Sequence, residues 1–93
     1  SEAAKAAFPM PKVHRNRTVI LETPIMRVRR EVRWDAETQK FIITNPDGRK
    51  SQVSTRYQVL LLCAIDAAQS EQYLKLLEDL QQNPTELVDA DEA

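Results

Sequence analysis

The side chains able to perform acid–base or nucleophilic chemistry are few and poorly placed for it. His14 is the only histidine and lies between Lys12 and Arg15, with no second histidine or cysteine close to it in the sequence. A metal site needs several such ligands, and a general base needs a carboxylate partner and a pocket. Cys63, the only cysteine, lies in an apolar run, where burial opposes formation of the thiolate. We therefore expect no catalytic site, no metal site and no cofactor.

Other classes of site are excluded by residue counts. Gly48 is the only glycine, whereas a phosphate-binding loop needs at least two glycines at fixed spacing. The carboxylate pairs Glu78–Asp79 and Asp89–Asp91 fall on a predicted helix face and a predicted tail, which is typical of solvated surface. A single cysteine cannot form an internal disulfide and fits a reducing compartment. The sequence therefore predicts a protein that is not an enzyme and that is cytoplasmic.

One feature stands out: a row of arginines between residues 25 and 34. Arg27, Arg29 and Arg33 alternate with apolar residues, the pattern of a strand with one cationic face and one apolar face. Guanidinium groups bind phosphates and carboxylates through paired hydrogen bonds. We expect a binding surface built from this row and from two arginines that precede it. Its members are Arg15, Arg17, Arg27, Arg29 and Arg33.

Three interpretations of this surface remain open: a solvated sheet face, a protein-binding face and a nucleic-acid-binding face. In the first, Glu31 and the acidic residues of the helices neutralise the arginines. Two observations count against nucleic acid. Trp34 and Phe41 fall on the apolar face instead of among the arginines, where bases could stack on them. The formal net charge is −1, whereas nucleic-acid-binding modules are usually strongly basic.

The charge is unevenly distributed along the 93 residues. Residues 11–33 hold seven Lys or Arg and two Glu, whereas residues 57–93 hold one Lys and eight Asp or Glu. We expect residues 1–16 to form a flexible basic arm, residues 17–83 a single domain, and residues 84–93 an acidic tail. No apolar run approaches the ~20 residues of a membrane-spanning helix, so we expect no membrane partner.

The first half of the domain predicts short strands. Their expected ranges are Thr18–Thr23, Ile25–Trp34, Lys40–Asn45 and Arg49–Val53. Pairing Asp35 with Lys40 places Trp34 opposite Phe41, so the apolar residues of the second and third strands coincide on one face. The segment from Asn45 to Gly48 predicts the turn into a polar edge strand. Arg30 is the exception to the alternation, because it falls on the apolar face.

The second half predicts helices. Ser54 or Thr55 can cap a first helix that runs to about Ala67, and Ser70 can cap a second helix over Glu71–Gln82. One long helix is the alternative, but the apolar stripe changes phase between residues 66 and 70, which favours two. The first helix is apolar on nearly every side, which is typical of a helix buried on more than one side.

The expected fold class is α+β: a small antiparallel β-meander of three to four strands followed by two helices. The expected function is a small non-enzymatic protein-interaction module, that is, an adaptor, assembly factor or inhibitor of a larger complex. Its partner would bind the arginine face or the uncovered part of the side formed by Val59, Leu62 and Cys63. The alternative is a nucleic-acid-binding protein that uses the arginine-lined face and the basic arm. A homodimer through the helices or an edge strand is compatible with both.

Overall fold

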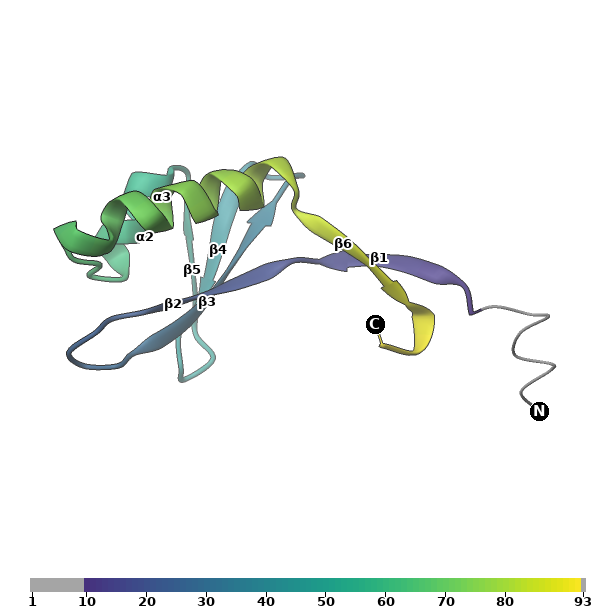
Figure 1. Ribbon diagram of the computed structural model, residues 1–93, viewed down its shortest axis with the longest axis horizontal. Helices are drawn as coiled ribbons and strands as arrows, with labels where there is room; N and C mark the ends of the chain where they lie inside the picture. Colours follow the sequence, from purple (N-terminus) through teal and green to yellow (C-terminus); the bar gives the residue numbers. More distant parts are fainter. Residues whose placement is uncertain (1–9, 93) are drawn as a thin grey trace.

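The computed structural model describes residues 10–92, and four antiparallel strands form its main sheet (Figure 1). These strands run in sequence order and are β2 (Thr18–Glu22), β3 (Arg29–Asp35), β4 (Lys40–Thr44) and β5 (Lys50–Val53). Two helices follow, α2 (Arg56–Leu62) and α3 (Ala67–Gln82), and they lie on the same face of the sheet. The expected α+β meander followed by two helices is confirmed.

The register of the central hairpin is the one that the apolar alternation predicts. Asp35 pairs with Lys40 and Trp34 with Phe41, and the two rings meet edge to face with their centroids 4.7 Å apart. The next hairpin turns at Asn45, whose carbonyl accepts a 2.9 Å hydrogen bond from the Gly48 amide. Gly48 has a φ of 86°, which glycine adopts without strain. β5 pairs only with β4 and is the polar edge strand that was expected.

The β2–β3 connection corrects one prediction. The alternation suggested that a strand starts at Ile25, but β3 begins only at Arg29. A turn occupies the intervening residues, and the Arg27 amide donates to the Thr23 carbonyl at 2.8 Å. Pro24 starts this turn because its ring fixes φ at a turn value. Two antiparallel strands need a connection, and the prediction left only Pro24 for one.

Both helices begin at a capping side chain. Thr55 and Gln58 form a reciprocal capping box at the start of α2. Asp66, not Ser70, caps α3, since its carboxylate accepts a hydrogen bond from the Gln69 amide at 3.1 Å. The first helix therefore ends earlier, and the second begins earlier, than predicted. The break falls at Ala64, whose φ is 54° and lies outside the helical region.

The core lies between the helices and one face of the main sheet. The inward residues of the strands meet buried residues of α2 and α3, and the members with no more than 1% exposure include Leu21, Val32, Phe41, Ile43, Val59, Cys63, Leu77 and Leu80. Alternate strand residues point to the opposite face, which no helix covers. We call this opposite face the open face.

Outside this domain, β1 (Lys12–Asn16) and β6 (Thr85–Asp89) pair with each other as a projecting two-stranded ribbon, which a short 3-10 helix, Ala90–Glu92, follows (Figure 1). The sequence predicted a flexible arm over residues 1–16 and an acidic tail over residues 84–93, so this pairing was missed. The pairing is long-range and charge-complementary, and no local periodicity reveals it. Residues 1–9 of the expected arm lie outside the described residues.

The ribbon makes the molecule elongated. The principal extents are 53 × 28 × 25 Å and the Cα radius of gyration is 16.6 Å, against about 12 Å for an equally long chain folded into a compact domain. Between residues 10 and 92, no helix has the length and apolar character needed to cross a membrane.

Candidate interaction surfaces

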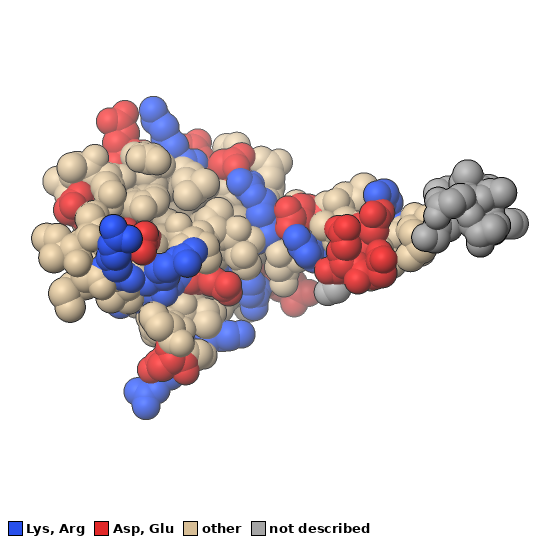
Figure 2. Space-filling view, turned by 60° about the horizontal axis from the view of Figure 1, so that its bottom comes forward, with Lys and Arg blue, Asp and Glu red and all other residues tan. Residues whose placement is uncertain are grey.

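Two of the five predicted binding arginines, Arg29 and Arg33, share the open face. The register places Glu22 opposite Arg29, and Glu31 lies between the two arginines on the same face of β3. The strands place charged residues of both signs on the open face: Arg29, Arg33, Lys40 and Lys50 are basic, and Glu22, Glu31 and Asp35 are acidic. On the face that Figure 2 presents, acidic and basic residues are likewise interspersed.

Two further predicted arginines pair with carboxylates of the same chain. Arg15, on the ribbon, donates to Glu86 at 2.8 Å. Arg17, where the ribbon meets the domain, lies 2.6 Å from a carboxylate oxygen of Asp79. Hydrogen bonds from Arg17 and from Asn83 lower the pKa of Asp79. Both arginines therefore hold the ribbon and its junction together.

The remaining predicted arginine, Arg27, lies in the β2–β3 turn with a φ of 52°. The structure therefore does not bring the five residues into one surface. It keeps one pair on the open face, uses one pair for internal ion pairs, and separates Arg27 from the strand. The period-two pattern is correct from residue 29 onward and wrong before it.

Four large apolar side chains are prominently exposed on the β2–β3 turn and on α2, at the end of the molecule opposite the ribbon (Figure 1): Ile25 (92%), Leu61 (80%), Met26 (76%) and Tyr57 (61%). Two exposed charged residues, Arg27 and Asp66, lie in the same turn and in the α2–α3 linker. Ile25 and Met26 come from the β2–β3 turn, and Tyr57 and Leu61 come from α2. We call this set the apolar end. Patches of this kind on small proteins mark interaction sites more often than scattered single residues do.

The apolar end is hollowed in two places. One hollow of about 440 Å³ lies between the β2–β3 turn and the α2–α3 linker, and is lined by Thr23, Pro24, Ile25, Met26, Val28, Arg30, Ala64 and Asp66. A second, of about 460 Å³, lies between the two helices and is lined by Tyr57, Leu60, Leu61, Ile65, Ser70 and Leu74. The α2–α3 linker contributes to both linings, with Ala64 and Asp66 in the first hollow and Ile65 in the second.

The exposed side of α2 is only partly the expected one. Of the side formed by Val59, Leu62 and Cys63, Val59 and Cys63 are buried against the core and Leu62 is exposed, at 37%. Tyr57 and Leu61 are more strongly exposed. α2 is therefore not buried on several sides.

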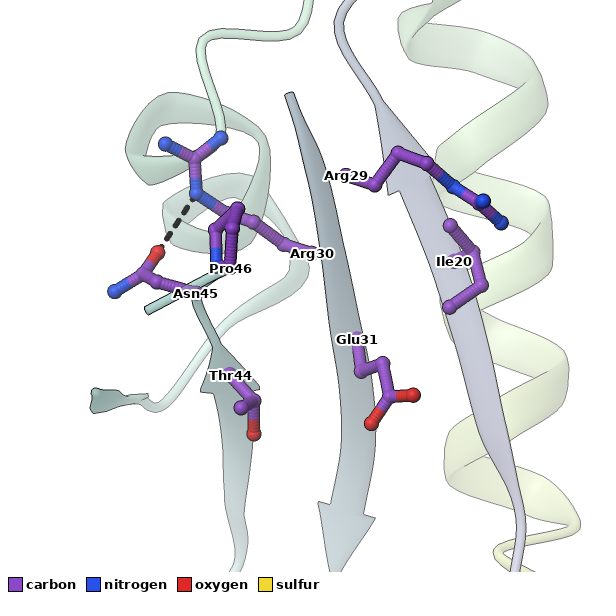
Figure 3. Close-up of a pocket in the computed structure, with 7 residues that line it drawn as sticks. All are labelled: Ile20, Arg29, Arg30, Glu31, Thr44, Asn45 and Pro46. Carbon is purple, nitrogen blue, oxygen red and sulfur yellow. Dashed lines mark hydrogen bonds between the residues drawn. The ribbon is translucent and has the colours of Figure 1, made fainter. Parts of the chain in front are cut away.

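Arg30 is the residue that the alternation left unexplained. It lies on the helix-facing side of β3 but beyond the core, and its Nε donates to the Asn45 side-chain oxygen at 2.8 Å. It lines both the 440 Å³ hollow and a third hollow of about 350 Å³ at the end of the open face. In that third hollow Arg29 lies over Ile20 and extends away from Arg30, so the two guanidinium groups do not converge (Figure 3).

The residues considered for catalysis are not assembled into a site. Burial raises the pKa of the Cys63 thiol, and the charge of Arg30 opposes this effect. His14 is exposed on the ribbon, and its Nδ1 lies 3.5 Å from the Thr85 hydroxyl. Within residues 10–92, no group of three or more His, Cys, Asp or Glu residues is arranged to hold a metal ion.

Comparison with models of known protein families, with curated proteins and with solved structures found no match for this chain. The surfaces therefore have to be interpreted from their own chemistry. Sequence reasoning missed Ile25 and Met26 as surface residues, although Pro24 before them was a signal for a turn. It identified Arg30 as an exception but did not include it in the site.

Proposed function

We propose that this protein is a small non-enzymatic protein-interaction module, an adaptor, assembly factor or inhibitor of a larger complex, that binds its partner through the apolar end. The observation that carries this proposal is the exposure of four large apolar side chains on the β2–β3 turn and on α2, next to two hollows with largely apolar linings. Aromatic residues and methionine are enriched at the centres of protein interfaces, and Tyr57 and Met26 lie here.

The surroundings of the apolar end also suit a protein partner. Residues 57–65 of α2 and the following linker include no charged side chain, so a partner need not desolvate a charge along this side. Arg56 and Glu78 form an ion pair at 3.1 Å at the start of α2 and can belong to a polar rim. An apolar centre with a charged rim is the usual anatomy of such an interface.

The alternative of nucleic-acid binding receives less support. Arg15 and Arg17 are paired with carboxylates of the same chain. On the open face, four basic residues are nearly balanced by three acidic ones, whereas binding to phosphates is favoured by a strongly positive surface. We therefore propose a protein as the partner.

The proposal is tested by affinity capture from a cell lysate with three matched variants. Met26→Asp and Leu61→Asp place a charge at the apolar end, whereas Leu87→Asp places one on the ribbon, where Leu87 is 58% exposed. We expect a partner that the wild type and the Leu87 variant retain, and that the other two variants lose by about tenfold or more, as expected for a charge buried at an interface centre. Folded protein that captures nothing, or equal capture by all variants, would contradict the proposal.

A further inference from the structure

We propose that the partner segment that fills the 440 Å³ hollow carries a carboxylate beside an apolar side chain, and that Arg30 binds this carboxylate. The inference rests on the proposed function and specifies the chemistry of the partner. It starts from the composition of the hollow, whose lining is largely apolar and contains two charged residues, Arg30 and Asp66.

The two charged residues differ in the hydrogen bonds and ion pairs that they form within the protein. The Asp66 carboxylate caps α3 by accepting from the Gln69 amide. The Arg30 guanidinium makes one hydrogen bond, from Nε to the neutral amide oxygen of Asn45. Among the residues that the structure describes, no carboxylate lies within ion-pair distance of Arg30, whereas Arg17 and Arg56 both have one. Arg30 therefore has no ion-pair partner among these residues.

A partner that binds in the hollow would remove water from the charged guanidinium of Arg30, which has an unfavourable free energy. Arg30 is half-buried, and water still reaches part of it in the free protein. A partner that covers the hollow with apolar groups alone would remove this water and leave a buried, unpaired cation, which is strongly unfavourable. A carboxylate avoids this penalty, because its two oxygens match the remaining N–H groups of the guanidinium in a paired geometry.

The shape of the hollow favours a peptide segment over a small acid. The hollow lies along the β2–β3 turn, where the lining residues Ile25 and Met26 are strongly exposed. An occupant that covers these two side chains as well as Arg30 must be larger than a small acid and must present more than one apolar group. A phosphate clamp is not indicated, because Arg29 extends away from Arg30 (Figure 3).

The test uses two synthetic peptides of equal length and follows the protein's backbone amides by NMR titration. One is acetyl-Leu-Glu-Leu-Glu-Leu-amide, and the other has Gln in place of both Glu residues. We expect the acidic peptide to shift the amides of Met26, Ala64 and Asp66, with a Kd about tenfold or more below that of the neutral peptide. Arg30→Gln should abolish the difference, and Arg30→Lys, which keeps the charge but not the fork, should reduce it. Arg29→Gln is the matched control and should preserve it. The dispersion of each spectrum reports that the variant is folded.

Several results would overturn the inference. Equal affinity for both peptides would show an apolar hollow without a carboxylate preference. A difference that persists in the Arg30→Gln variant, or no binding of either peptide, would also contradict it. Octanoate that binds the same amides more tightly than the acidic peptide would identify a small-acid site instead. None of these results affects the capture experiment with Met26, Leu61 and Leu87, so the proposed function can stand or fail separately.

Discussion

Ala64 follows the C-cap of α2 and has a left-handed backbone conformation, which is unfavourable for alanine. Its amide donates to the Leu61 carbonyl at 3.1 Å, and the Ile65 amide donates to the Leu60 carbonyl at 3.0 Å. These two bonds form the Schellman motif, in which the residue after the C-cap adopts a left-handed conformation and is usually glycine. The φ of Ala64 is 54°, so its Cβ is held in a strained position.

Ala64→Gly should therefore stabilise the protein. Ala64 is exposed, so the substitution loses little packing. We expect the free energy of unfolding to rise by about 1 kcal/mol, and the Tm by about 4–8 °C. Thermal unfolding followed by circular dichroism measures the change. The matched control is Gln72→Gly at an exposed position inside α3, which should destabilise the protein by about 1 kcal/mol. A lower Tm for the Ala64 variant would contradict the strain argument.

At the residue scale, alternation in the sequence correctly predicted which arginines share a face within β3, and it failed for the arginine that lies outside the strand. Arg29 and Arg33 lie on one face because side chains alternate along β3. Arg27 was misplaced because alternation alone does not show where a turn begins, and its left-handed backbone is unusual for a residue with a side chain. The lack of a carboxylate partner for Arg30 within the described residues was not predictable, since it depends on which carboxylates the fold brings near.

At the scale of elements, Arg17 joins the ribbon to the end of α3. Its amide donates to the Pro84 carbonyl at 2.8 Å, and its guanidinium pairs with Asp79 at 2.6 Å. Asn83 donates to the same carboxylate at 3.0 Å. The cation therefore lies at the C-terminal end of a helix, where the helix dipole also favours it.

This junction predicts a dependence of stability on acid pH. Because the pKa of Asp79 is lowered in the folded state, its contribution to stability is present above the unfolded pKa, near 3.8, and is lost as the pH falls through the folded value. Asp79→Asn should lower the Tm at pH 7, and the difference from wild type should shrink as the pH falls below about 3.8 and on through the lower pKa of the folded state. Glu37→Gln, in the β3–β4 turn, is the control and should show no comparable difference. A constant difference between pH 7 and pH 2 would contradict the prediction.

The elements were predictable to different degrees for a physical reason. The β3–β4 register follows from the sequence, because a shift of one residue would move Trp34 and Phe41 out of the core. The ribbon follows from no such constraint. Lys12 and Asp89 are joined by an ion pair although they are distant in sequence, and neither face of the ribbon faces the core. Its strands therefore lack the apolar alternation that marks a half-buried strand.

At the scale of the whole molecule, stability and length are provided by different parts. All the core residues lie between Val19 and Leu80, within the main sheet and the helices. The ribbon lengthens the molecule, but its residues are mostly exposed. A two-stranded ribbon is at best marginally stable without the domain to which it is attached.

Removing the ribbon should therefore lower the free energy of unfolding by less than removing one aromatic ring from the core does. A chain of residues 17–84 should unfold cooperatively and keep the Trp34 fluorescence of the full protein. The substitution Phe41→Ala, at a position with no exposed surface, should lower the free energy of unfolding by about 3–5 kcal/mol. Urea unfolding of both proteins gives the comparison. A truncated chain less stable than the Phe41 variant would show that the ribbon supports the domain.

Because β1 pairs with β6, the chain enters the domain and leaves it through two neighbouring strands. Lys12 and Asp89 are direct partners in the ribbon, so their Cα atoms are about 5 Å apart. The segment of residues 12–89 can therefore be grafted into a surface loop of an unrelated host without stretching the host backbone, because its two ends lie next to each other. Such a chimera would display Ile25 and Leu61 at the tip of a stalk, pointing away from the host.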